Sequence, residues 1–277
     1  MSEYNFLYKE IPYPLLAEVG LTQEMIDDLP VDVLAMIQMG RCSPVLPIEI
    51  KDDGGHAVKA RAKFSLVQTM DSRTDVVFHP ILDHKGKFVC IMEKDEKTGQ
   101  EVPRLADGYA LYSAETMEML DAGKVALGHV TGKEGNKVKA FLQLDPDTRE
   151  VISIPTAAIG RNLQILAREL DLTAPETNCL QAGEVLCLAQ GDELISVGLD
   201  LNALTGIRIE RGDERLWREH AARKWEKYSV GLFGCWKMEN GCLSYIYEED
   251  YTEEIWEDIE RQREFCQNET MATKTNR

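Results

Sequence analysis

Apolar and polar residues alternate in three stretches of the chain, and each stretch follows a short apolar segment that ends in a glycine. The stretch at 111–154 shows the pattern most clearly. Ser113 can cap a helix, and Gly123 stands where a left-handed residue would end that helix, a conformation that glycine adopts without strain. Apolar residues at every second position of 137–144 predict a strand with one buried face. Two further strands are expected at 125–130 and 151–154.

The same order of elements occurs twice more. Around Gly40 it predicts a helix at 31–38 and strands at 45–50, 56–67 and 75–79. Around Gly183 it predicts a helix opened by the capping-box residues Thr173 and Glu176, and then strands at 185–190, 193–201 and 207–210. The sequence therefore predicts an α+β fold of repeated modules, each with one short helix and a three-stranded antiparallel meander. Because such a module buries only one sheet face, neighbouring modules are expected to pack together.

These patterns predict six segments along the chain. They are an N-terminal module with two extra short helices (1–82), an insertion or linker (83–110), a second module (111–155), a helix with a third module (156–210), an aromatic and acidic C-terminal subdomain (211–268) and a disordered tail (269–277). The C-terminal subdomain is expected to be a helix near 213–227, a hairpin near 229–247 and a helix at 252–266. The hairpin would turn at Asn240 and Gly241.

Aromatic residues concentrate in this C-terminal subdomain, and they suggest either a compact aromatic core or a partner-binding surface. Trp and Tyr dominate the energetics of protein interfaces. The candidate partner-binding residues are Trp217, Trp225, Trp236, Tyr247 and Trp256. The first two are eight residues apart and are expected on one face of a helix.

The seven cysteines are scattered and show neither zinc-ligand spacing nor a C-x-x-C motif. Cys235 and Cys242 invite interpretation as a disulfide. With a turn at 240–241, however, Cys242 would stand opposite Glu239, and Cys235 would stand opposite Ile246. Free thiols packed as small apolar side chains are therefore expected.

The formal net charge of −17 is the most unusual bulk property of the chain. It opposes direct binding to nucleic-acid phosphates and to anionic membranes. It is compatible with plain solubility, with a basic protein partner and with mimicry of nucleic acid. Residues 248–260 contain eight acidic residues and no basic one. No apolar run is long enough for a transmembrane helix and the start lacks signal-peptide features, so a cytoplasmic location is expected.

No set of residues indicates a catalytic, cofactor or metal site, and none of these is expected. His79 precedes a proline at the end of a predicted strand, and no second histidine or carboxylate stands at a suggestive spacing. Carboxylate pairs are abundant, but chance produces such pairs among 48 acidic residues. His79 is therefore interpreted as structural.

Two regions resemble known families. The segments "YKEIPYPLLAEVGLTQEMIDDL", "MGRCSPVLPIEI", "ARAKFSL" and "VVFHPI" within residues 8–81 resemble a family of unknown function from conjugative transposons of Bacteroides-type bacteria. Residues 111–154 resemble a companion repeat family, also of unknown function. The resemblance implies an accessory protein of a mobile genetic element, and it supplies no catalytic residues.

Three functions are considered. The first is a non-enzymatic accessory protein that binds a protein partner, with oligomeric state left open. The second is an acidic inhibitor or DNA mimic directed at a nucleic-acid-binding protein, such as a host defence nuclease. The third is an enzyme of unrecognised type, whose site would be assembled from distant residues.

Overall fold

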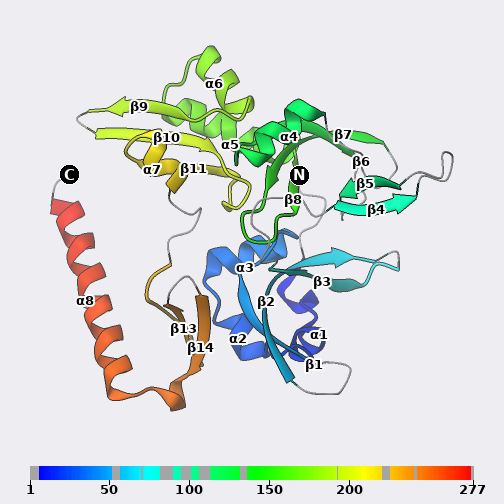
Figure 1. Ribbon diagram of the computed structural model, residues 1–277. Coiled ribbons are helices and arrows are strands. Elements are labelled where there is room, and N and C mark those ends of the chain that lie inside the picture. Colours follow the sequence, from blue (N-terminus) through cyan, green and yellow to red (C-terminus); the bar gives the residue numbers. More distant parts are fainter. Residues whose placement is uncertain are drawn as a thin grey trace. The chain divides into compact units, whose positions relative to one another are not determined.

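The computed structural model describes residues 6–51, 57–69, 71–81, 90–94, 101–105, 113–131, 136–191, 193–219, 225–239 and 242–275. These residues form helices, four three-stranded antiparallel sheets and one two-stranded hairpin (Figure 1). The prediction of an α+β fold with repeated strand meanders is confirmed. The chain divides into two compact units, unit 1 (Met1–Asn5 and Ile81–Lys224) and unit 2 (Phe6–Pro80 and Trp225–Arg277). The six predicted segments are finer than this division and stay a prediction.

The first part of unit 2 contains η1 (Tyr8–Glu10), α1 (Tyr13–Ala17), α2 (Gln23–Asp27), α3 (Val31–Gln38), β1 (Leu46–Lys51), β2 (Ala57–Gln68) and β3 (Thr74–Pro80). Its second part contains β12 (Tyr228–Val230), β13 (Gly234–Glu239), β14 (Cys242–Tyr247), η2 (Glu248–Asp250) and α8 (Glu253–Thr275). The helices α1 and α3 contact the sheet β1–β2–β3. The apolar interior of this part of unit 2 includes Leu16, Ile37 and Phe64, each at most 1% exposed.

The segment 83–110 of unit 1, predicted as an insertion or linker, contains a hairpin whose strands were not predicted, β4 (Cys90–Lys94) and β5 (Glu101–Leu105). The second module follows as α4 (Ala114–Asp121), β6 (Ala126–Thr131), β7 (Lys137–Leu144) and β8 (Val151–Pro155). The third module comprises α5 (Thr156–Glu169), α6 (Ala174–Gln181), β9 (Leu186–Gln190), β10 (Glu193–Leu199), β11 (Ile207–Arg211) and α7 (Glu214–Glu219).

The helices α3, α4 and α6 end in the same way, at Gly40, Gly123 and Gly183. The φ angles of these glycines are 69°, 70° and 85°, in the left-handed region. Each glycine N–H donates to the carbonyl three residues earlier, and the next N–H donates to a carbonyl five residues earlier. This pair of bonds is the Schellman motif, which satisfies the last carbonyls of a helix and turns the chain away from its axis. In all three places the chain then enters a meander.

Two predicted helix starts are confirmed. Ser113 Oγ accepts a hydrogen bond of 3.2 Å from Thr116 N. Thr173 and Glu176 form a complete capping box, in which Thr173 Oγ1 accepts from Glu176 N and the Glu176 carboxylate accepts from Thr173 N. Each cap satisfies helix N–H groups that have no partner within the helix.

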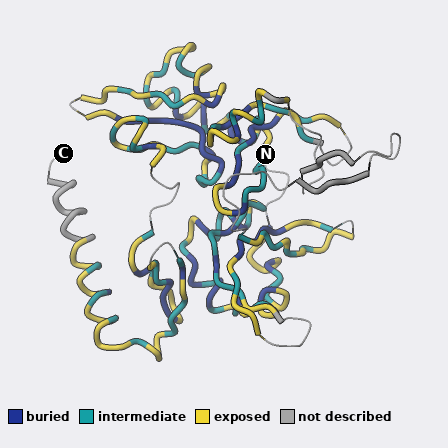
Figure 2. The backbone as a smooth tube through the Cα atoms, viewed as in Figure 1, coloured by how far each residue is buried: buried dark blue, intermediate teal, exposed yellow. Residues whose placement is uncertain are grey.

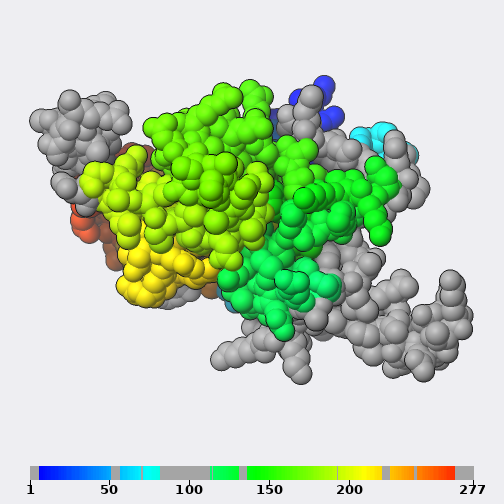
Figure 3. All heavy atoms as spheres, turned by 90° about the horizontal axis from the view of Figure 1, so that it is seen from above, coloured from blue at the N-terminus to red at the C-terminus, as the bar shows by residue number. Residues whose placement is uncertain are grey.

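The second and third modules share one apolar core. The sheet β6–β7–β8 packs α4 against one face and α5 against the other. The face toward α5 joins the interior of the third module through Phe141, Leu163 and Val197, each at most 3% exposed. Gln143 Oε1 also accepts a 2.6 Å hydrogen bond from Leu201 N. The buried residues appear as dark blue stretches in Figure 2, and the two modules form one continuous body (green to yellow) in Figure 3.

The helix expected at 213–227 is described in part, as α7 (Glu214–Glu219), because residues 220–224 lie outside the described residues; residues 225–227 are not helical. Among the described elements, α7 contacts β10 and β11 of unit 1. Trp217 holds it there, because its indole is 6% exposed and donates from Nε1 to Arg208 O over 3.2 Å. The Arg208 guanidinium lies 3.8 Å from the centroid of the indole, and it also pairs with the buried Asp200 at 2.9 Å. The helix is thus held on the third module.

The remaining C-terminal elements also differ in part from expectation. Instead of a two-stranded hairpin, β12, β13 and β14 form a three-stranded meander. The predicted register is confirmed, with Cys242 opposite Glu239 and Cys235 opposite Ile246, and both thiols are free. The helix α8 continues through Thr275, into the segment 269–277 for which disorder was expected. Good helix formers in "ETMATK" are compatible with this extension.

Candidate functional site

A buried carboxylate joins the two sequence-distant parts of unit 2. Asp28 follows the last residue of α2 and is 5% exposed. Its oxygens accept hydrogen bonds from Leu232 N (2.6 Å), Phe233 N (2.9 Å) and the Tyr245 hydroxyl. Bonds to a charged acceptor are stronger than neutral ones. Gly231 permits this approach, because a Cβ there would lie 2.1 Å from Asp28 Cγ.

An aromatic stack forms the second connection between these parts. Trp236 is fully buried, and its Nε1 donates to Met25 O over 2.9 Å. Its ring packs edge-on against Tyr245 with centroids 5.2 Å apart, and Tyr245 packs edge-on against Tyr247 at 5.0 Å. The Tyr247 hydroxyl lies 3.1 Å from Thr22 Oγ1. Burial, followed by the hydrogen bond to Asp28, raises the pKa of Tyr245, so its hydroxyl remains a neutral donor.

The Asp28 bonds hold an apolar loop at the surface, which we define as residues 230–233. Large apolar side chains in this loop are exposed by 41% at Val230, 77% at Leu232 and 43% at Phe233. A further backbone bond of 2.8 Å from Gly231 N to Gly234 O closes the loop. An exposed apolar cluster on a fixed backbone is typical of a protein-binding surface.

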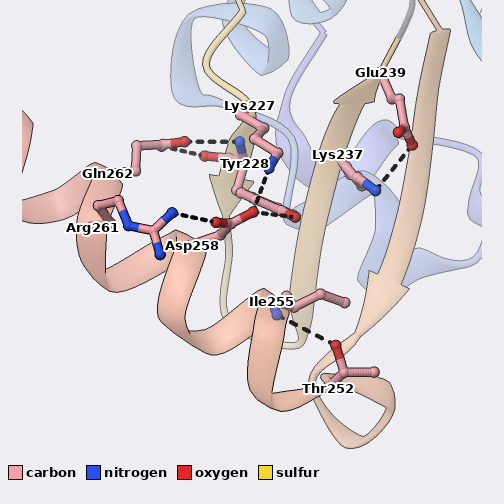
Figure 4. A network of polar contacts seen from close by, with 9 residues as sticks. All are labelled: Lys227, Tyr228, Lys237, Glu239, Thr252, Ile255, Asp258, Arg261 and Gln262. Atoms are coloured by element: carbon pink, nitrogen blue, oxygen red, sulfur yellow. Dashed lines mark hydrogen bonds and ion pairs between the residues drawn. The ribbon is translucent and has the colours of Figure 1, made fainter.

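The start of α8 is fixed to strand β12 by a polar network (Figure 4). The Gln262 amide bonds both backbone groups of Tyr228, accepting from its N–H (3.0 Å) and donating to its carbonyl (2.8 Å). Asp258 pairs with Lys227 and with Arg261. The hydrogen bond from Lys227 is the main cause that lowers the pKa of Asp258. Beneath this network, Ile259 is 1% exposed and packs with Tyr228.

The acidic residues of 248–260 face solvent on η2 and α8. Seven of the eight are exposed, and none of these seven forms an ion pair among the residues that the structure describes. Acidic groups in the first turn of a helix are favourable, but Glu257 and Glu260 lie beyond that turn and gain nothing from the helix dipole. Trp256 lies among them and is 41% exposed.

The structure does not gather the five predicted partner-binding residues into one patch. Trp217 is buried in unit 1, whereas Trp225 is partly buried and belongs to unit 2, outside α7. Trp236 is fully buried and Tyr247 is partly buried in the aromatic stack. Trp256 alone among the five is an exposed side chain. Their role in binding a partner stays a prediction.

The sequence did not reveal the residues that hold the apolar loop and α8 in place. Asp28 is one of many acidic residues, and its bond to Leu232 spans 204 positions. Gln262 carries no motif. The sequence Val230-Gly231-Leu232-Phe233 did contain one signal, a glycine inside an apolar run, which indicates close approach of another group.

The structure places His79 Nε2 2.9 Å from Ser65 Oγ. Among the described residues, no group of three or more His, Cys, Asp or Glu side chains is arranged to hold a metal ion. Within the same part of the chain, no helix is both long and apolar enough to cross a membrane.

Comparisons with known proteins reach only the N-terminal region. Neither a curated protein nor a solved structure matches the chain. A family model does match residues 6–86, which is less than a third of the chain and corresponds to the first part of unit 2. The N-terminal region thus matches a family described as "Protein of unknown function (DUF4099)".

Proposed function

We propose that the chain is a non-enzymatic interaction protein that binds a protein partner through the apolar loop at 230–233. The observation that supports this is the exposure of Leu232 and Phe233 on a backbone held by Asp28. Burying such side chains against a partner gains hydrophobic free energy, about 25 cal/mol for each Å² of apolar surface. A fixed loop loses little conformational entropy on binding, so more of that gain remains as affinity.

We further propose that the protein acts in the cytoplasm as an accessory factor of a mobile genetic element. The family match of residues 6–86 supports relatedness to a family of unknown function. The resemblance of residues 8–81 and 111–154 to conjugative-transposon families supports the mobile-element context. Direct binding to nucleic acid is not part of the proposal, because a net charge of −17 opposes it.

Co-purification from the native host, followed by mass spectrometry, tests the partner. The informative variant is Leu232→Ser with Phe233→Ser, because deletion of residues 225–277 would remove the whole second part of unit 2. Val77→Ser is the matched control, since Val77 is also exposed in unit 2, by 40%, but lies on β3. The proposal expects a stoichiometric partner that the double variant loses and the control retains. Equal capture by all three proteins would contradict it.

The seven exposed, unpaired carboxylates of 248–260 favour a second function, an acidic inhibitor or DNA mimic. Its target would be a nucleic-acid-binding protein. Electrostatic binding of this kind weakens steeply with salt, whereas binding by the apolar loop does not. Glu253→Gln with Glu257→Gln should then weaken capture more than the apolar double variant does. A partner whose capture is insensitive to salt would rule out the mimic.

A further inference from the structure

Unit 1 contains a small cavity between the sheet and helices of the second and third modules. Its volume is about 230 Å³, and its lining residues come from β6, β7, α5 and α6. Phe141 and Leu163, at 3% and 2% exposed, form an apolar floor, and the partly exposed Leu127 stands opposite Phe141 in the strand pairing. Thr156, Lys139 and Gln181 supply polar groups at the wall. An apolar cavity with a few polar groups is the usual form of a ligand site.

Gly160 also lines this cavity. It lies inside α5, where glycine is less favourable than alanine by about 1 kcal/mol. Its φ is not in the left-handed region, and a Cβ built on it would meet nothing within 4 Å. Neither conformation nor crowding therefore requires a glycine here. A ligand that approaches the helix backbone would require one.

One cationic side chain, Lys139, lines the cavity in a chain whose net charge is −17. Lys139 is exposed and forms no ion pair with any residue that the structure describes. His129 stands directly opposite Lys139 in the pairing of β6 with β7, on the same sheet face. Thr156 begins α5, a helix with no side-chain cap and no acidic residue in its first turn, so the positive helix end is at the same wall.

We propose that this cavity binds a small carboxylate with an unbranched or compact apolar body. Its volume of about 230 Å³ is below the roughly 300–1,000 Å³ of ordinary ligand pockets, so only a small ligand fits. The apolar tail of such a ligand would lie on Phe141 and Leu163 and pass Gly160, and the carboxylate would meet Lys139 at the rim. This inference is independent of the partner proposed for unit 2, because the cavity belongs to unit 1.

Titration of the full chain with octanoate, followed by ¹H–¹⁵N NMR, tests the inference. Saturable shifts are expected at the amides of Leu127, Phe141, Gly160 and Gln181. Octanol and octylammonium, which share the tail, should bind at least about threefold more weakly, because they lack the charge that pairs with Lys139. Absence of saturable shifts, or octanol binding as tightly as octanoate, would overturn the proposal.

Two variants separate lost binding from lost folding. Lys139→Gln should weaken octanoate about 3- to 10-fold, while Lys137→Gln, with the same charge change on the same strand, should leave it unchanged. Gly160→Ala should weaken octanoate at least about tenfold by placing a methyl group in the cavity, yet raise the thermal midpoint of the free protein. Unchanged affinity in both Lys139→Gln and Gly160→Ala would refute the site.

Discussion

Unit 1 joins neighbours in the sequence, whereas unit 2 joins segments that are more than 200 positions apart. The modules of unit 1 share one core of apolar side chains, such as Phe141 and Val197. Unit 2 is closed by directional bonds, in which Asp28 and Met25 accept from the C-terminal meander. An apolar core tolerates substitutions that keep its volume, whereas a connection made by hydrogen bonds is lost when one donor or acceptor is removed. Single substitutions should therefore affect unit 2 selectively when they fall on these bonds.

The largest expected effect comes from Trp236→Ala. It removes a fully buried indole and the donor to Met25 O, and it should destabilise unit 2 by about 3–5 kcal/mol. Hydrogen exchange measured by mass spectrometry should show lost protection in 22–28 and 225–247, with 159–199 unchanged. Trp217→Ala is the mirror control and should affect unit 1 instead. Equal loss in both units for either variant would show that the two units do not unfold separately.

A second comparison lies within unit 1, between two glycines that end helices. Gly123→Ala meets no atom within 4 Å and should cost only the left-handed backbone strain, about 1 kcal/mol. Gly183→Ala would place its Cβ 1.9 Å from Val125 O, so repacking of the second module adds about 1–3 kcal/mol. Urea unfolding of both variants measures the difference. Equal losses would contradict the close approach of the two modules at this point.

Asp28→Asn tests the hydrogen bonds that connect the two parts of unit 2, and it leaves the volume of the side chain nearly unchanged. The amide keeps one acceptor but turns a donor toward groups that also donate, and the loss should be about 2 kcal/mol. Thermal unfolding of the variant should show it, together with faster exchange at the amides of Leu232 and Phe233. Asp250→Asn, on an exposed carboxylate, should change neither. Wild-type exchange in the Asp28 variant would mean that the loop is held by other contacts.

The smallest expected effect is a gain in stability, whereas the three preceding predictions are losses. Asp171 follows the end of α5 with φ at 50°, and Leu172 N donates to Ala167 O as in the glycine-ended helices. Asp171→Gly should relieve the strain and stabilise unit 1 by about 0.5 kcal/mol. Asp171→Ala should not stabilise it, because alanine also resists this conformation. A urea midpoint that rises for both variants would attribute the effect to the lost charge.

The sequence predicted the modules well because their signals are local. Alternation and a following turn define β7, and Gly40, Gly123 and Gly183 stand directly after their helices. The ends of these strands agree with the structure to within one or two residues in most cases. Local signals also predicted the Cys235 and Cys242 register.

The assembly of unit 2 had no such signal. Acidic residues are too common for Asp28 to stand out, and the aromatic run looks the same whether it forms a core or a surface. The sequence grouped Trp217 with the C-terminal aromatics, because it shows neither Arg208 above the indole nor Gly198 beneath it. The cavity near Gly160 likewise depends on three-dimensional packing, although a glycine inside a predicted helix was visible.

The discontinuous unit 2 has a consequence for synthesis on the ribosome. Residues 6–80 emerge first, but the strand that carries Trp236 follows only after the whole of unit 1 has been made. At 5–20 residues per second, that interval is roughly 10–30 s. During that interval the residues that donate to Met25 and Asp28 have not been synthesised, so we expect this surface to stay uncovered and to be a target for a chaperone.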